Sequence, residues 1–314
     1  MDPARRIQIV AERQPVTLVV AGVVLYALGP VLVAGAEVSG PVLSFWRLWF
    51  GVVVMGVVSS VYLGVTGRWP SRRGWSRAAA CGVVFAVHQL FFMSAVRMTS
   101  VVDVTLMQVL QPLVVAVLAV RAFGERPGIR FRTWSALAIS GAAVVALGGA
   151  SGPQGDPVGI AFAVLNVVFF AVYFVWSKQA RADIDVVPFL FGVTVVAAVV
   201  VSLLVAATGE APSSAGQGDL LVALAIAVGP GALGHFVSTW PLRWVAANVP
   251  PLLQLAIPFV AGFLAWLVLD EGITFAHLVG GMLTIVGAVG AIASPAGRRM
   301  VGRNEAAPAS LEGG

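Results

Sequence analysis

The chain has 314 residues, of which 59% are hydrophobic and 11% are charged, and its mean hydropathy is +0.95. A soluble domain carries about 25% charged residues, so this composition excludes a soluble globular enzyme, a disordered chain and a nucleic-acid-binding domain. The net charge of +5 comes from arginines in the predicted loops, and the single cysteine, Cys81, excludes an internal disulfide and a cysteine-based metal cluster.

Hydrophobic runs of membrane-spanning length follow one another along the whole chain. The first run is longer than the apolar core of a signal peptide, about 7–15 residues, so we interpret it as a span. Residues 1–15 and 294–314 are predicted to be tails, the second of them disordered because it is polar and rich in small residues. The predicted helices cover residues 16–34, 42–63, 78–96, 103–122, 133–149, 158–177, 187–207, 220–240, 247–269 and 273–293.

The positive charges support ten spans with both termini in the cytoplasm. If the N-terminus is inside, all of the 19 Lys and Arg residues except Arg47 and Arg97 fall in the tails and the inside loops. Such an asymmetry is typical of inner-membrane proteins, whose cytoplasmic loops are rich in Lys and Arg. An error of one helix in the count would invert every later loop and destroy the pattern.

The sequence also matches itself at an offset of 146 residues. Residues 106–112 align with 252–258, so that Gln108 pairs with Gln254 and Pro112 with Pro258. The two units, 16–150 and 151–293, would each hold five helices. Because five is odd, the second unit would be inverted in the membrane, and inverted repeats are typical of secondary transporters that alternate between two similar states.

Each of the two units carries a set of loosely spaced motif residues. They are Phe45-Trp46-Arg47, Pro112, Gly124-Glu125 and Gly141 in the first unit, and Gly159, Ala171, Tyr173, Trp176, Pro258, Glu271, Gly280-Gly281 and Gly287 in the second. With these motifs the chain resembles the EamA branch of the drug/metabolite transporter superfamily. The resemblance implies an all-helical integral membrane protein with ten spans, alternating access and, usually, export of a small metabolite or amino acid. The pair Asp270-Glu271 and the internal histidines depart from the family pattern and leave the coupling mechanism open.

Two histidines are candidates for the transport site. His88 falls near the middle of the third predicted helix, and His235 falls in the eighth, one residue away from the repeat register. Polar groups inside an apolar bundle are costly, and histidine titrates near neutral pH. We therefore interpret both as substrate-binding groups or a proton relay, with hydrogen bonding between helices as the alternative.

Three glutamines form a second candidate group. Gln108 and Gln254 are repeat mates, and Gln111 shares a helix face with Gln108. An amide offers two donors and an acceptor, which suits an amino acid or a heterocycle. The alternative is hydrogen bonding between helices, worth roughly 0.6 kcal/mol in membranes.

Asn166 and Tyr173 lie seven residues apart on the sixth predicted helix and therefore share a face, which makes them further candidates for the cavity. Pro112 and Pro258 are predicted to kink the fourth and ninth helices, because a proline removes one backbone hydrogen bond. Each kink is either a packing feature, or a pivot or exposed carbonyl that faces the substrate.

The charged residues near the spans are expected to be structural. Arg47, about six residues from the outer end of its helix, is expected to snorkel outward toward Glu37, with binding of a carboxylate as the alternative. Glu125 and Glu271 are interpreted as caps or loop latches, and Asp103 as an N-cap. No carboxylate is clearly buried at mid-membrane, so proton coupling would have to use histidine, and facilitated diffusion or exchange is an alternative.

The sequence thus predicts a secondary transporter rather than an enzyme. Importer or exchanger, intramembrane enzyme and non-transporting membrane protein are the rival interpretations. The predicted partners are a small-molecule substrate, the lipid bilayer and, as an open alternative, protons. No nucleic acid, cofactor or metal is expected, since the sequence has no Walker motif and no cluster of metal ligands.

Overall fold

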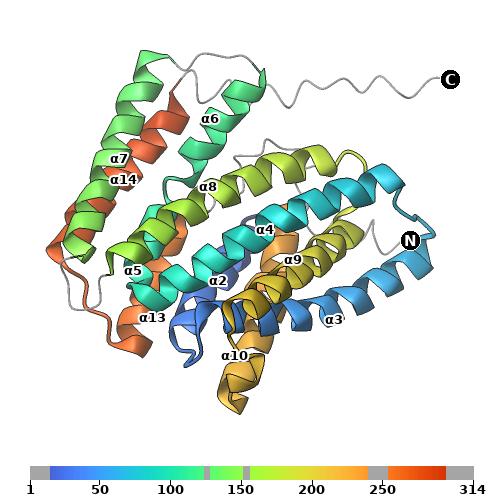
Figure 1. Cartoon of the computed structure of the whole chain (residues 1–314). Helices are drawn as coiled ribbons and strands as arrows, with labels where there is room; N and C mark the ends of the chain where they lie inside the picture. Colours follow the sequence, from blue (N-terminus) through green and yellow to red (C-terminus); the bar gives the residue numbers. More distant parts are fainter. Residues whose placement is uncertain (1–14, 124–127, 151–155, 240–253, 295–314) are drawn as a thin grey trace.

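The structure is a computed structural model that describes residues 15–123, 128–150, 156–239 and 254–294, and all regular elements within these ranges are helices (Figure 1). The first repeat contains α2 (Pro15–Ala34), α3 (Gly40–Thr66), α4 (Arg72–Met98), α5 (Val101–Gln108), α6 (Gln111–Phe123) and α7 (Ile129–Ala150). The second contains α8 (Pro157–Ala180), α9 (Val186–Thr208), η1 (Pro212–Ser214), α10 (Gln217–Ile226), η2 (Ala227–Gly234), α11 (His235–Thr239), η4 (Gln254–Ala256), α13 (Ile257–Leu269) and α14 (Phe275–Ala293).

The described helices are those of a multi-pass membrane protein. Five helical stretches are long and apolar enough to cross a membrane, and shorter apolar helices accompany them. Large apolar side chains also cover the outside of the bundle, as on α3, where Val53, Val57, Val61 and Val65 are exposed along one face. Exposed apolar faces of this kind suit a lipid environment and would be a liability in water. The long stretches are Gly40–Thr66, Arg72–Met98, Pro157–Ala180, Val186–Thr208 and Gln217–Thr239.

The fourth predicted helix is interrupted instead of continuous. Residues 109 and 110 separate α5 from α6, and they make short-range bonds from Val109 N to the Leu106 oxygen and from Leu110 N to the Met107 oxygen. Pro112 has no N–H to bond the carbonyl four residues earlier. The interruption therefore lies just before Pro112, which is the second residue of α6.

The eighth predicted helix changes its winding. Between α10 and α11, residues Ala227–Gly234 form the π-helix η2, and Pro230 lies inside it. In an α-helix the proline ring would clash with the carbonyl of Ile226, and the wider π turn relieves this clash. Such turns often occur at functional sites.

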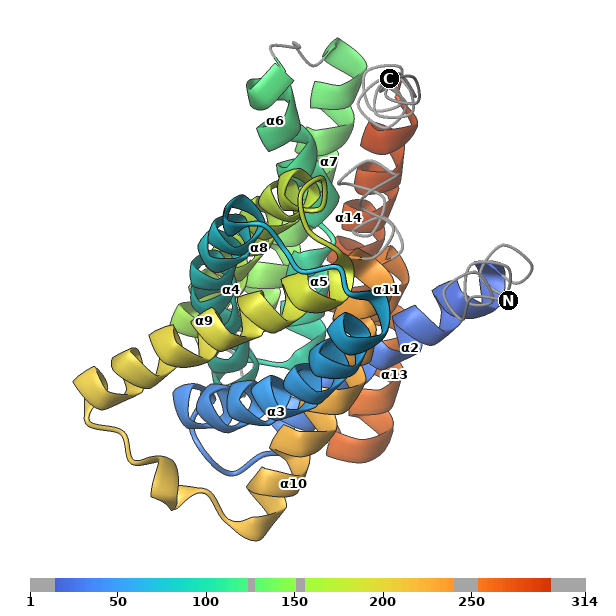
Figure 2. The same ribbon diagram turned by 90° about the vertical axis from the view of Figure 1, so that its right-hand side faces the viewer.

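Several contacts between two helices have a counterpart in which both helices are replaced by their mates from the other repeat. The contact of α4 with α8 corresponds to that of η2 with α2, and the contact of α4 with α9 corresponds to that of α10 with α3. The contact of α6 with α8 corresponds in the same way to that of α13 with α2. α3 lies on its own mate α9, and α7 lies beside its own mate α14 (Figure 1 and Figure 2). The repeat seen in the sequence is therefore also present in the tertiary packing.

The α7–α14 contact repeats this relation in detail. A Cβ added to Gly141 would lie 2.5 Å from the Thr284 nitrogen, and one added to Gly287 would lie 2.4 Å from the Ala138 nitrogen. Gly141 and Gly287 are 146 residues apart, and so are their contact partners Ala138 and Thr284 (141 and 287, 138 and 284). The absence of a side chain at these glycines lets the two backbones touch, as small residues do between membrane helices.

Candidate functional site

Two adjoining cavities lie where helices of both repeats meet. The larger has a volume of about 50 Å³ and the smaller about 20 Å³, and Arg47 and His235 line both. Space for one water needs roughly 10–15 Å³ on this measure, so the larger cavity has room for only a few non-hydrogen atoms. Its walls include Tyr26, Pro30, Arg47, His88, Gln89, Phe92, Gln108, Phe170, Pro230, His235 and Ile257.

Aromatic rings pack tightly around these cavities. The His88 ring stacks on Phe170 with centroids 4.0 Å apart and an interplanar angle of 9°. Phe85 contacts His235 edge-on at 4.9 Å and Tyr173 at 5.1 Å. Such contacts hold the rings in fixed positions, each worth about 0.5–1.5 kcal/mol beyond its buried area.

Tyrosines and histidines from both repeats line the cavities. Tyr26 and Tyr173 are 147 residues apart, and so are His88 and His235, which is one residue more than the repeat offset of 146 (26 and 173, 88 and 235). The Tyr26 ring lies 5.5 Å from the His235 ring, and Tyr173 lies 6.1 Å from it. The cavity wall is therefore built from nearly matching positions of both halves.

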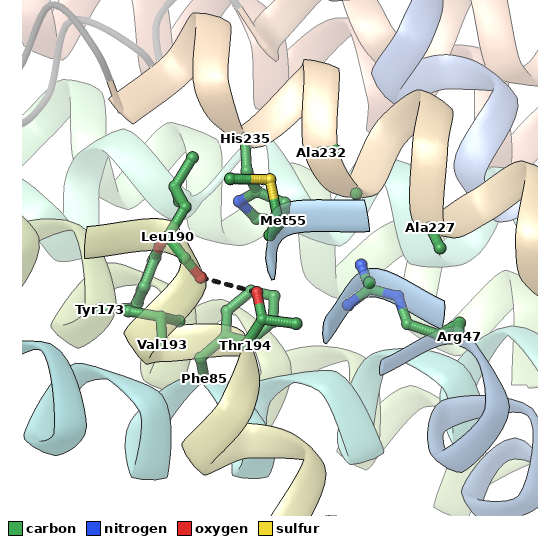
Figure 3. Close-up of a pocket in the computed structure, with 12 residues that line it drawn as sticks. Arg47, Met55, Phe85, Tyr173, Leu190, Val193, Thr194, Ala227, Ala232 and His235 are labelled. Carbon is green, nitrogen blue, oxygen red and sulfur yellow. Dashed lines mark hydrogen bonds between the residues drawn. The ribbon is translucent and has the colours of Figure 1, made fainter. Parts of the chain in front are cut away.

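Arg47 points into the cavities, so the predicted outward orientation toward Glu37 is wrong. Its side chain is 6% exposed, and its guanidinium carbon lies 5.6 Å from the centre of the Phe85 ring. Figure 3 shows Arg47 and His235 pointing into the smaller cavity, where Thr194 also lies. In the region between α2 and α3 another residue, Arg97, binds the backbone oxygens of Ala34 and Glu37.

Gly231 of η2 lies next to the Arg47 side chain. A Cβ added to Gly231 would be in ordinary contact with Arg47 Nη2 at 3.4 Å, and it would approach the Ile226 oxygen to 2.7 Å. The π-helix η2 thus passes directly beside the guanidinium. Sequence reasoning underestimated Arg47 because this inward face depends on a neighbouring helix from the other repeat.

Residues 14–147 and 157–293 match the EamA-like transporter family, one match for each repeat of the helical packing. The chain belongs to this family. EamA-family proteins are transporters, which implies a small-molecule substrate and a lipid bilayer as its surroundings. A solved structure described as "Crystal structure of protein" aligns with a TM-score of 0.62 at 18% identity, covering 88% of this chain and 95% of that chain. This similarity shows a shared fold, and no curated protein matches the chain.

The other predicted site residues of this EamA protein fall in three places. Gln108 lines the larger cavity, and Tyr173 lines the smaller one. Gln111 and Asn166 are buried, with Asn166 close to His88, but neither lines a cavity. The side chain of Gln254 lies outside the described residues.

The two prolines occupy equivalent positions. Pro112 is the second residue of α6, and Pro258 is the second residue of α13. Proline is well tolerated in a first helical turn because its missing N–H would have no partner there. Each proline thus marks the start of a helical segment, and Ile257 beside Pro258 lines the larger cavity.

A second buried polar cluster joins the two repeats away from the cavities. His277 Nε2 lies 3.1 Å from Asp103 Oδ1, and the Thr274 backbone N–H donates to His277 Nδ1. This pattern assigns the ring proton to Nε2. Ser100, and not the predicted Asp103, caps α5, because its hydroxyl accepts from the Asp103 backbone N–H.

Glu271 completes this cluster, which we call the loop latch (Asp103, Glu271 and His277). Its carboxylate accepts hydrogen bonds from the Val101 backbone N–H at 3.0 and 3.2 Å, at the start of α5. Burial raises the pKa of Glu271, and the backbone N–H groups oppose this shift. The contact agrees with the latch role that the sequence predicted for Glu271.

Proposed function

We propose that this EamA-family protein is a secondary transporter of the inner membrane that moves a small metabolite by alternating access through the two cavities. The observation that carries the proposal is the position of the cavities. They lie between the repeats, and their walls contain Tyr26 and His88 from the first repeat and Tyr173 and His235 from the second, each pair within one residue of the repeat register. A site on such an axis can face either side of the membrane when the repeats exchange conformations.

The proposed direction is export, because the sequence resemblance implies it. The proposed substrate contacts are those predicted from the sequence, extended by Arg47. The described carboxylates do not line either cavity, so proton coupling would depend on the histidines, and facilitated diffusion remains the simpler mechanism. The residues predicted from the sequence are His88, Gln108, Gln111, Asn166, Tyr173, His235 and Gln254. Of these, His88, Gln108, Tyr173 and His235 line the two cavities together with Arg47.

The first test needs no knowledge of the substrate. Purified protein in detergent is screened by thermal unfolding against amino acids, nucleobases, organic acids and amphiphilic cations, since a ligand of the folded state raises its stability. Compounds that give a saturable shift then enter counterflow assays in proteoliposomes. We expect saturable counterflow for one chemical class.

The absence of counterflow for every compound that binds would contradict the transport function. Oriented vesicles separate export from import, because export requires uptake into inside-out vesicles to exceed uptake into right-side-out vesicles. The reverse ratio would identify an importer.

A further inference from the structure

Arg47 is a buried cation that lacks an acidic partner in the described part of the chain. It is 6% exposed, and no ion pair or hydrogen bond joins it to a described carboxylate. Placing an unpaired charge inside a protein or membrane is costly unless a ligand or partner compensates it. An anion in the cavity would supply that compensation.

The described carboxylates are engaged or exposed elsewhere. Seven of them bind partners in loops or first helical turns: Asp183 binds Arg73 and Arg77, Asp185 binds Tyr62, Asp219 binds the backbone of Glu37, Glu210 binds Ser39, Asp103 and Glu271 belong to the loop latch, and Asp156 binds Val158. Glu37 and Asp270 are exposed. None of these carboxylates lines a cavity with Arg47.

The cavity offers further polar groups without a partner beside the cation. Arg47 Nε, Gln89 Nε2 and His235 Nδ1 are buried without a hydrogen-bond partner among the described residues, and all three side chains line the larger cavity. The two nitrogens of Arg47 and Gln89 are donors, and His235 Nδ1 is a donor in the tautomer that carries its proton there. A carboxylate accepts hydrogen bonds only and has two oxygens to offer. Such a group complements a guanidinium with neighbouring donors better than an amine or a hydrocarbon does.

The charge has no counterpart near the matching position of the other repeat. Val193 lies 146 residues after Arg47 and Thr194 lies 147 residues after it, and both line the smaller cavity. The Thr194 hydroxyl donates to the Leu190 oxygen at 2.7 Å, as Figure 3 shows. One half of the site is therefore cationic and its counterpart is neutral, which matches a ligand with one charged end.

We propose that Arg47 forms an anion-binding subsite and that the cargo is a small organic acid carried as its carboxylate. This inference rests on the proposed transport function. The remaining wall is aromatic and apolar, with Phe92, Phe170 and Ile257. The volume of about 50 Å³ leaves room for only a few non-hydrogen atoms, which suits a short carboxylate with a small apolar body.

The test uses matched ligands and purified full-length protein in chloride-free detergent buffer. Propionate and propionamide have the same shape, but only propionate is charged, and thermal stabilisation measures the binding of each. We expect propionate to bind at least about tenfold more tightly than propionamide. Alanine, which adds an ammonium group that meets no described carboxylate, is expected to bind at least about tenfold more weakly than propionate.

The variants locate this preference at Arg47. Arg47→Gln is expected to abolish the difference between propionate and propionamide. Arg47→Lys keeps the charge without the bidentate geometry, so it should retain part of the preference, and it also serves if the Gln variant fails to fold. The control Arg132→Gln makes the same substitution at an exposed position of α7 and should leave the preference unchanged.

Several results would overturn the inference. Equal binding of propionate and propionamide, or an unchanged preference in Arg47→Gln, would remove the anion subsite. If alanine binds as tightly as propionate, the cargo is not a simple organic acid. If chloride raises the thermal stability as much as propionate does, the cavity holds an adventitious ion only. Counterflow assays separate the two proposals. Binding of propionate without any flux would contradict transport. Flux of a neutral or cationic solute that is unchanged in Arg47→Gln would contradict the anion subsite.

Discussion

Individual polar side chains define the cavity because the helices around them are otherwise apolar. His88 lies between Phe85 and Phe170, with its ring stacked on Phe170. Gln108 reaches the same cavity from α5, whereas Gln111 is buried outside it. Position along a helix therefore does not by itself place a polar group in the site.

Removing either cavity-lining polar side chain should impair transport more than folding. We expect His88→Ala and Gln108→Ala each to lower transport roughly tenfold, since a lost ring contact or hydrogen bond of about 1.4 kcal/mol corresponds to a factor of ten. Proteoliposome flux measures the effect, with protein amount as the check on expression. The controls are Val83→Ala and Gln217→Ala, both at exposed positions. Flux equal to that of the wild type in both cavity variants would remove these residues from the site.

The sequence predicts which residues are unusual better than it predicts which way they point. His88, Gln108 and Tyr173 are conspicuous as polar groups in apolar runs, and the structure places all three at a cavity. Arg47 lies in an equally apolar helix, and a helix that is apolar all round gives no periodic signal for its inward face. Its direction depends on Gly231 and Phe85, which come from other elements.

The helices meet most closely where glycines replace side chains. In α7 and α14, Gly141 and Gly287 bring the backbones together at equivalent points. The sequence predicted their equivalence from the shared offset. It could not predict the contact, because the offset relates the two helices without stating that they touch.

Adding one methyl group at Gly141 should loosen the α7–α14 pair. Its Cβ would lie 2.5 Å from both the Gly280 oxygen and the Thr284 nitrogen, so one helix must move. We expect Gly141→Ala to lower the free energy of unfolding by about 1–3 kcal/mol, measured by unfolding in detergent. Gly64→Ala is the matched control, because a Cβ there meets nothing within 4 Å. Equal stability of the two variants would refute the close contact.

The contribution of the loop latch to the free energy of unfolding should fall as pH rises, because burial raises the pKa of Glu271. A carboxyl whose folded pKa is raised contributes stability below its unfolded pKa, about 4.5, and loses that contribution as pH rises through the folded pKa. Glu271→Gln should therefore remove one component of the pH dependence of unfolding. The difference in the free energy of unfolding between the two proteins is measured from below pH 4.5 to neutral pH. A constant difference would contradict this role.

At the scale of the molecule, the repeat connects sequence, packing and proposed mechanism. The sequence predicted two five-helix units, and the family match and the exchangeable helix pairs agree with two units. The breaks at residues 109–110 and at η2 were not predicted as changes of helix type, although Pro112 and Pro230 are visible in the sequence. How a helix adjusts to a proline depends on its neighbours.

The orientation of the units gives a topology prediction. The distribution of Lys and Arg predicts that both termini are cytoplasmic. Tags at either end should be inaccessible to impermeant reagents in intact cells and accessible after permeabilisation. An externally accessible C-terminal tag together with a protected N-terminal tag would contradict an even number of spans, and external access to both tags would contradict the predicted orientation.

Access to the cavity from both sides of the membrane is the central claim. Cys81 is the only cysteine and is buried, so Gln108→Cys in a Cys81→Ala background places a single thiol in the larger cavity. An impermeant thiol reagent is applied to vesicles of known orientation, first from one side of the membrane and then, in a separate sample, from the other. As a control, Val83→Cys in the same background measures the labelling of a thiol on the outer surface of the bundle. The account predicts that the thiol at position 108 reacts from either side, since each half-cycle opens the cavity to one of them. Reaction from one side only would contradict alternating access through this cavity.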